Sequence, residues 1–163
     1  MRSVEISKAI SASEFFAGKE LIAEYAASLG IDLCFQNFTE ELASLGEMYT
    51  PPDGCLLLAQ MTNELVGCVA IRRCDASTCE MKRLYVRAKY QGQGAGRYLA
   101  EAAIKCAKRL GYTRMVLDTL SSMTAAQALY RSLGFKKISG YYPNPLSGAQ
   151  FMALDMEKVQ DAS

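Results

Sequence analysis

The chain contains a glycine-rich segment, Gln91-Gly92-Gln93-Gly94-Ala95-Gly96, between a strand-like run and a helix-like run. The strand-like run is Met81 to Val86, and the helix-like run is Ala95 to Leu110. Glycines at such a turn leave backbone N–H groups accessible, and the helix start adds unpaired N–H groups and the positive end of its dipole. The segment therefore predicts a binding site for the phosphate groups of a ligand.

The glycine spacing excludes two common phosphate-binding loops. The dinucleotide fingerprint G-x-G-x-x-G needs a third glycine where Arg97 stands, and the triphosphate loop needs a Gly-Lys-Ser or Gly-Lys-Thr that the chain lacks. The segment does fit Q-x-x-G-x-G, read as Gln91, Gly94 and Gly96. That pattern resembles the coenzyme A pyrophosphate loop of the GNAT N-acetyltransferases.

Two neighbouring segments extend this resemblance in the expected order. Leu84-Tyr85-Val86 precedes Gln91 at the spacing typical of the family, and Ala126 to Phe135 is similar to the family's A-x-x-L-Y-x-x-x-G-F segment. The resemblance covers Cys79 to Phe135 by motif, whereas from Val4 to Cys74 it depends on the order of elements alone. It implies an acyltransferase that uses acetyl-CoA as co-substrate, without a metal.

The composition fits one ordinary globular domain. The chain has 163 residues, half of them apolar, and we expect a single domain over 1–163 with its core at about 4–157. A net charge of +1 favours neither nucleic acid nor a membrane surface as a partner. The short polar start and the absence of a long apolar run predict a cytoplasmic protein.

The side-chain inventory restricts the chemistry. The chain has no histidine, and its six cysteines form no C-x-x-C pair, so a zinc site is not expected. The missing histidine also removes the Ser-His and Cys-His nucleophile systems. Acid–base catalysis would therefore depend on a carboxylate, Tyr, Cys, Lys or water. The cysteines are expected to be reduced and mostly buried, with a disulfide between Cys74 and Cys79 as an alternative.

Periodicity and turn signals predict eleven elements in the order β-α-α-β-β-β-α-β-α-β-β. Hairpins followed by a β-α-β crossover indicate an α/β (α+β) fold with a mixed, mostly antiparallel sheet and helices on both faces. This is also the element order of the GNAT fold. The expected elements are strands over 4–10, 55–61, 65–73, 80–86, 113–119, 135–141 and 150–156, and helices from Ser11 or Ser13 to Leu29, over 40–45 and 95–110, and from Ser122 or Met123 to Leu133.

The resemblance assigns the coenzyme site. In the GNAT fold, the strands that match Glu80–Val86 and Thr113–Thr119 splay apart, and the pantetheine arm lies between them. Met123 replaces an asparagine that contacts the coenzyme in many relatives, and Arg87 and Lys89 could reach the 3′-phosphate or be solvated. The expected coenzyme-binding residues are Leu84, Tyr85, Val86, Gln91, Gly92, Gln93, Gly94, Ala95, Gly96 and Arg97.

Two residues are candidates for catalysis. The resemblance places Tyr130 near the coenzyme sulfur as an acid, with a packing role as the alternative. Glu80 stands at the spacing of a glutamate base in the histone-acetylating branch of the family, and an ion pair with Lys82 on the same strand face would weaken it as a base. A water relay through Asp118 or Tyr142 is the alternative base.

The expected acceptor-binding residues are Phe35, Gln36, Tyr142 and Asn144, with Phe38, Tyr49 and Tyr141 as further candidates. Arg83 or Arg72 could hold an acceptor carboxylate. We expect a small-molecule primary amine, of a metabolite or amino-acid type, attacking acetyl-CoA directly in a ternary complex. A protein lysine or N-terminal acetyltransferase and a non-catalytic acyl-CoA sensor are the alternatives, and a homodimer is an open option.

Overall fold

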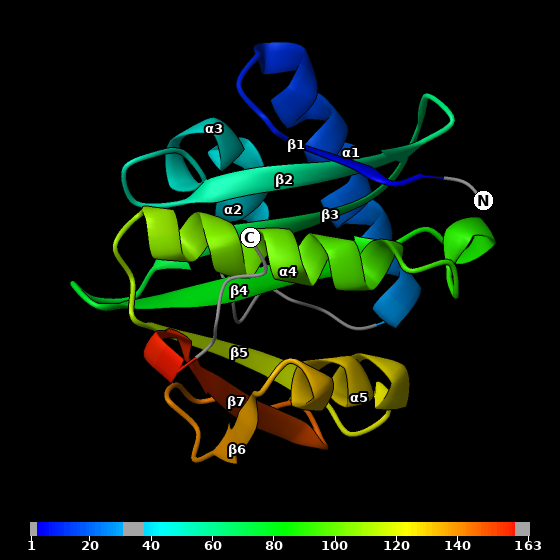
Figure 1. The fold of residues 1–163 in the computed structure, drawn as a ribbon. Helices are drawn as coiled ribbons and strands as arrows, with labels where there is room; N and C mark the ends of the chain where they lie inside the picture. Colours follow the sequence, from blue (N-terminus) through cyan, green and yellow to red (C-terminus); the bar gives the residue numbers. More distant parts are fainter. Residues whose placement is uncertain (1–2, 31–37, 159–163) are drawn as a thin grey trace.

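A seven-stranded sheet forms the centre of the protein (Figure 1). The computed structural model describes residues 3–30 and 38–158. The order in the sheet is β1-β2-β3-β4-β5-β7-β6, and only β4 and β5 pair in parallel among these strands. This confirms the predicted mixed, mostly antiparallel sheet. The strands are β1 (Glu5–Lys8), β2 (Cys55–Met61), β3 (Glu64–Arg73), β4 (Thr78–Val86), β5 (Arg114–Leu120), β6 (Lys136–Ile138) and β7 (Ala149–Asp155).

Helices cover both faces of the sheet, as predicted (Figure 1). On one face lie α4 (Ala95–Arg109) and α5 (Thr124–Ser132), whose apolar residues belong to one core cluster. On the other face lie α1 (Ala12–Leu29), α2 (Phe38–Ala43) and α3 (Leu45–Met48). Short 3₁₀ turns follow β4 and β7, at Ala88–Tyr90 and Met156–Lys158.

Local sequence signals fix the ends of α1. The Ser11 hydroxyl accepts a hydrogen bond from Glu14 N at 3.2 Å, and the Glu14 carboxylate accepts one from Ser11 N at 2.9 Å. This capping box satisfies two backbone donors that a helix start leaves unpaired. Gly30 follows the last turn with φ 65°, in the left-handed region where glycine is favoured. The helix therefore matches its predicted span.

Two apolar cores lie on opposite faces of the sheet. The larger core joins β2 to β5 and β7 with α4 and α5, and the smaller core joins β2 and β3 with α1 and α3. Four cysteines are buried in these cores as free thiols, as predicted: Cys55, Cys68, Cys79 and Cys106. Cys74 is exposed and also free, so the alternative disulfide to Cys79 is absent. Cys34 lies outside the described residues.

The structure differs from the prediction at the start of α2 and at the end of β6. The short helix predicted from Glu40 begins instead at Phe38, and a further turn, α3, follows it. The strand predicted over 135–141 is only three residues long, Lys136–Ile138. It stops because Tyr141 and Tyr142 leave the sheet and donate hydrogen bonds to carboxylates on β4 and β5.

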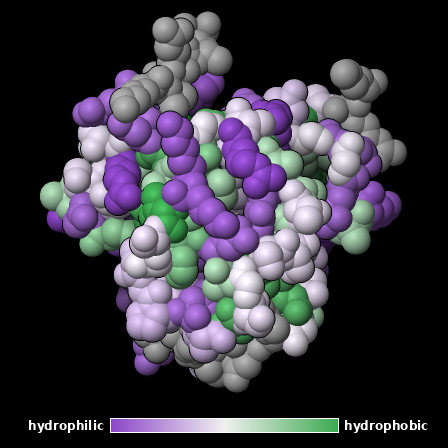
Figure 2. Space-filling view, turned by 90° about the horizontal axis from the view of Figure 1, so that it is seen from below, coloured by the Kyte–Doolittle hydropathy of each residue, from purple (hydrophilic) through white to green (hydrophobic). Residues whose placement is uncertain are grey.

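The surface carries few large apolar side chains. On the face seen in Figure 2, hydrophobic side chains form small separate areas among hydrophilic ones. Among the described helices, none combines the length and apolarity needed to cross a membrane. Within 3–30 and 38–158, no cluster of three His, Cys, Asp or Glu residues is arranged to hold a metal ion.

Candidate active site

The glycine-rich segment connects β4 to α4 and presents backbone N–H groups. Gly92 and Gly94 adopt φ of 81° and 92°, in the left-handed region, and a Cβ at Gly92 would meet no atom within 4 Å. The first bond of α4 runs from Tyr98 N to Gly94 O at 3.1 Å. The N–H groups of Ala95, Gly96 and Arg97 therefore lack carbonyl partners within the helix. The turn has the geometry of an anion site at the positive end of a helix dipole.

A cavity of about 410 Å³ lies against this turn. The end of β4 and the start of α5 form its other walls, and Met123, at the position of the family asparagine, is among them. Six predicted coenzyme-binding residues line this cavity: Leu84, Val86, Gln91, Gly92, Ala95 and Gly96. Four others do not line it, namely Tyr85, Gln93, Gly94 and Arg97.

Arg97 is engaged elsewhere on the surface. Its guanidinium donates to Ser132 Oγ at 2.7 Å and lies 3.8 Å from a carboxylate oxygen of Glu101 on the same helix. Gln91 instead turns back to the strand, because its Nε2 donates to Val86 O at 2.9 Å. This bond ties the glycine turn to the last residue of β4.

A second cavity, of about 300 Å³, lies where β4 and β5 separate. The two strands pair only over Thr78–Glu80 and Arg114–Val116, and they diverge beyond those residues. The cavity shares Leu84, Val86, Gln91 and two residues at the start of α5 with the first cavity. The two spaces therefore form neighbouring parts of one channel, from the glycine turn into the gap between the strands. Tyr85 also lines the second cavity.

A bulge in β4 changes which residues share a face. Arg83 has φ 61°, and the pairing with β3 skips from Ala70↔Lys82 to Cys68↔Tyr85. Regular alternation along the predicted strand would place Glu80, Lys82, Leu84 and Val86 on one face, and the bulge makes that expectation wrong. Leu84 and Val86 pack with the α4 core, whereas Tyr85 packs with the α1 core. The extra residue of the bulge causes this change, because side chains alternate strictly only in a regular strand.

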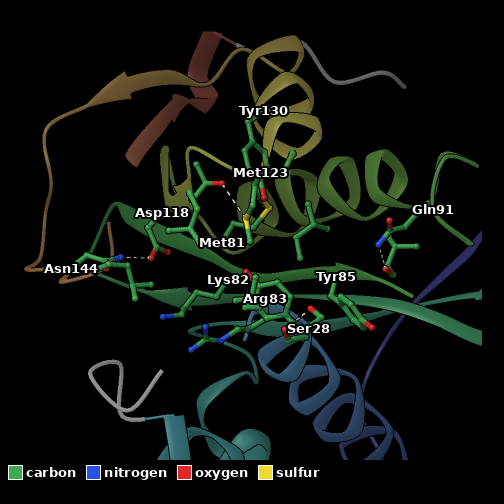
Figure 3. A pocket seen from close by; sticks show the side chains of 18 of the residues that line it. Ser28, Met81, Lys82, Arg83, Tyr85, Gln91, Asp118, Met123, Tyr130 and Asn144 are labelled. Carbon is green, nitrogen blue, oxygen red and sulfur yellow. Dashed lines mark hydrogen bonds between the residues drawn. The ribbon is translucent and has the colours of Figure 1, made fainter. Parts of the chain in front are cut away.

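Tyr130 reaches from α5 toward the second cavity (Figure 3). Its side chain is almost wholly buried, and its ring lies 5.7 Å from that of Phe135. Within the described chain its hydroxyl makes no hydrogen bond. Burial raises the pKa of Tyr130 above its usual value, so the phenol stays protonated and can donate a hydrogen bond.

Asp118 and Asn144 lie at the end of the second cavity opposite Gln91 (Figure 3), and Tyr142, which does not line the cavity, is bonded to Asp118. The Tyr142 hydroxyl donates to Asp118 Oδ2, and Asn144 Nδ2 donates to the same oxygen at 3.2 Å. Burial and the bond to Asp118 raise the pKa of Tyr142. The structure thus brings the predicted residues Tyr142 and Asn144 together at Asp118.

Glu80 lies beside this end of the site but lines neither cavity. Its buried carboxylate accepts a hydrogen bond from Tyr141 at 2.6 Å and lies 3.0 Å from Arg72 Nε. The ammonium of Lys82 is 3.9 Å away, so the two groups form only a long ion pair. Its assignment as a base remains a prediction.

Two arginines that could bind anions have carboxylate partners. Arg83 donates to both oxygens of Glu41, at 2.9 and 2.7 Å, in a buried pair, and its guanidinium lies over the Phe38 ring. Arg87 donates to both oxygens of Glu24, at 2.9 Å each. These partners occupy the donors that the sequence analysis offered to an acceptor carboxylate or the 3′-phosphate.

Several acceptor candidates are placed away from the cavity or are not described. Phe35 and Gln36 lie outside the described residues. Tyr49 is fully buried in the smaller core. Conversely, Tyr25 and Ser28 of α1 line the second cavity, and sequence reasoning missed them. A tyrosine on the apolar face of a predicted helix gave no signal that could separate a cavity wall from a core.

Comparison with known proteins identifies the family. The sequence model of the acetyltransferase (GNAT) family matches residues 19–135. An uncharacterised N-acetyltransferase of Schizosaccharomyces pombe is 42% identical over 142 residues, which cover 86% of this chain and 87% of that protein. Human N-acetylaspartate synthetase is 31% identical over 109 residues, 64% of this chain but only 36% of that protein.

The fold leads to the same family. A GNAT acetyltransferase from Elizabethkingia anophelis, solved with acetyl-CoA bound, superimposes with a TM-score of 0.68 at 25% identity, over 93% of this chain and 97% of that one. An acetyltransferase from Streptococcus agalactiae superimposes with a TM-score of 0.74 at 24% identity, over 92% of this chain and 96% of that one, and shows the likeness of fold. The chain therefore belongs to the GNAT family and is an N-acetyltransferase that depends on acetyl-CoA.

Proposed function

We propose that the protein acetylates the primary amine of a small metabolite or amino-acid-like acceptor, by direct attack in a ternary complex. The observation that carries this proposal is one channel with different chemistry at its two ends. Backbone N–H groups of the glycine turn lie at one end, and Asp118 and Asn144, with Tyr142 bonded to Asp118, lie at the other. The name of one relative, N-acetylaspartate synthetase, supports an amino-acid-like acceptor.

The residues present fit coenzyme A. The N–H groups of Ala95 and Gly96 would bind the pyrophosphate, and the diverging end of β4, over Leu84–Val86, would bind the pantetheine arm. When bound, acetyl-CoA supplies a reactive thioester carbonyl and a thiol leaving group. The backbone N–H groups of β4 that β5 leaves unpaired are candidates for stabilising the oxyanion.

Tyr130 would act at the leaving sulfur. The protonated phenol would donate a hydrogen bond to the sulfur as the C–S bond breaks. Its raised pKa makes full proton transfer harder, so its main contribution would be that hydrogen bond.

The acceptor amine must lose a proton, and two carboxylates are candidates for receiving it. We favour a water relay to Asp118, because Asp118 lines the cavity and Glu80 does not. Removing a general base lowers kcat by about 10²–10⁴-fold. We therefore expect that loss for Asp118→Asn. The same result for Glu80→Gln, with Asp118→Asn active, would identify Glu80 as the base.

Direct attack is favoured over a covalent acyl-enzyme. None of the five described cysteines lines either cavity, and four of them are buried in the cores. Burial raises the pKa of Cys68 and Cys79 to about 12, which keeps both thiols protonated and poorly nucleophilic. The amine nitrogen would therefore form its bond to the thioester carbon without a thiol intermediate.

The experiment combines binding with turnover. Purified protein is titrated with acetyl-CoA by calorimetry, a pool of amines is added, and the release of free thiol is followed. Binding with amine-dependent release supports the enzyme, and acetylation of protein lysines alone would favour the protein-acetylating alternative. Tyr130→Phe should lower kcat by about 10–100-fold and leave acetyl-CoA affinity unchanged. Tyr98→Phe, at an exposed tyrosine outside both cavities, is the control. Tight binding with no release would favour the sensor.

A further inference from the structure

Lys82 is a buried cation with unused hydrogen-bonding capacity. It lines the cavity between β4 and β5, and its side chain is only 5% exposed. An ammonium group carries three N–H donors. Among the described residues its one ion pair is with Glu80, at 3.9 Å, which is beyond hydrogen-bond distance, and the more distant Glu41 acts on it only through its charge. Burying an ammonium group that lacks hydrogen-bond acceptors costs free energy, and an anion bound beside it would lower that cost.

Within the part of the chain that the structure describes, the ammonium of Lys82 has no acceptor within hydrogen-bond distance because the neighbouring charged groups pair with one another. The Glu80 carboxylate accepts the Tyr141 hydroxyl and lies closer to Arg72, at 3.0 Å, than to Lys82. The bidentate pair with Glu41 occupies Arg83, the next residue of β4. Arg72, Lys82 and Glu80 thus combine two cations with one anion. The excess positive charge lies at the lysine that faces the cavity.

The same end of the cavity also carries a carboxylate. Asp118 lies on β5, across the cavity from β4, and the uncharged donors Tyr142 and Asn144 hold it. Figure 3 shows Lys82, Asp118 and Asn144 at the end of the cavity away from Gln91. A cation on one wall and a carboxylate on the other are complementary to a molecule that carries both an amine and a carboxylate.

We infer that Lys82 binds a carboxylate of the acceptor, so that the acceptors are amino acids with the reacting amine directed toward Asp118. This inference rests on the proposed function, because it names the acceptor class of that site. Burial lowers the pKa of Lys82, and an anionic ligand beside it would favour the charged form again. Lys82 is assigned to binding, with no proton transfer of its own.

The test compares matched pairs of amines. Each amino acid is paired with the amine that its decarboxylation would give and that keeps no carboxylate: phenylalanine with phenethylamine, leucine with 3-methylbutylamine, and lysine with cadaverine. Thiol release from acetyl-CoA gives kcat and KM for each. For the preferred amino acid, the wild type should show a KM about 10–100-fold lower than for its decarboxylated partner, as one charge-assisted hydrogen bond allows. Equal or better use of the decarboxylated amines would overturn the inference.

Variants at Lys82 separate binding from other roles. Lys82→Met keeps most of the side-chain volume and removes the charge, so it should raise KM for the amino acid about 10–100-fold and leave KM for the decarboxylated amine nearly unchanged. Lys82→Arg should restore part of the preference. Lys19→Met, at an exposed lysine of α1, is the control. An equal fall of kcat for both members of a pair would show that Lys82 is a base or a structural residue.

A binding measurement distinguishes failure of this inference from failure of the proposed function. The complex with coenzyme A is titrated with the same amino acids and with their N-acetyl derivatives by calorimetry. One outcome is that the amino acids bind to the wild type but not to Lys82→Met, and that no thiol is released. That outcome would support the carboxylate site and refute the proposed reaction. Turnover of amines alone, with no binding of any carboxylate that depends on Lys82, would refute the inference and leave the N-acetyltransferase proposal standing.

Discussion

The buried pair between Arg83 and Glu41 should make a large and pH-dependent contribution to stability. It joins the bulge of β4 to α2, with side chains 4% and 2% exposed and N–O distances of 2.7 and 2.9 Å. Removing one partner leaves the other as an uncompensated buried charge, at a cost of about 3–5 kcal/mol. In a domain of this size that corresponds to a fall in Tm of about 6–20 °C. Glu41→Gln should show this loss in thermal and urea unfolding.

The two single variants should respond differently to pH. Burial alone would raise the pKa of Glu41, but the hydrogen bonds and charge of Arg83 outweigh burial and hold it below its usual value. In the wild type the pair therefore stabilises the fold above the unfolded pKa of about 4.3, and this contribution is lost as pH falls through the folded pKa. In Arg83→Met the remaining carboxyl can take up a proton, so its penalty should shrink between pH 7 and pH 4.5. In Glu41→Gln the guanidinium stays charged, so the penalty should persist.

Urea unfolding at several pH values measures both penalties, and the double variant Glu41→Gln/Arg83→Met should be less destabilised than the sum of the singles. The exposed pair Arg73–Asp53, at 3.6 Å, provides the control, because Arg73→Met should change stability by no more than about 0.5 kcal/mol. The reasoning would be refuted by single-variant losses below about 1 kcal/mol, or by equal losses at both ends of the pH range.

Three further predictions concern local structure. Ser11→Ala removes the cap of α1 and should cost about 1 kcal/mol in urea unfolding. Gly94→Ala puts a side chain at φ 92°, so it should destabilise the fold by about 1–2 kcal/mol and weaken acetyl-CoA binding, whereas Gly46→Ala in α3, where a Cβ meets nothing closer than 4.0 Å, should do neither. Gln91→Ala loses the bond to Val86 O and should raise KM for acetyl-CoA about fivefold; an unchanged KM would show that this bond does not order the turn.

Short sequence patterns predicted correctly those parts of the fold that are determined by residues close together in the chain. Three such parts depend on neighbours a few residues away: the cap at Ser11, the glycine turn before α4, and the hairpin turn between the strands predicted over 55–61 and 65–73. In that hairpin turn Thr62 and Asn63 have φ of 52° and 64°. The bulge at Arg83 and the early end of β6 were not predicted. Each is held by a contact with a distant segment, Glu41 in the first case and Glu80 in the second. A sequence pattern carries no direct information about such pairs.

The bulge also explains why the candidate acceptor end could be predicted only in part. In a regular strand Lys82, Leu84 and Val86 would share a face, and the lysine would lie beside the apolar walls of the channel. The extra residue at Arg83 moves Leu84 and Val86 to the α4 face, while Lys82, paired with Ala70, stays on the α1 side. One strand therefore offers apolar side chains to the channel near the glycine turn and a cation near Asp118. A variant that removes the bulge, deletion of Arg83, should abolish both acetyl-CoA binding and acceptor selectivity. Loss of only one of them would mean that the two ends of the channel are positioned independently.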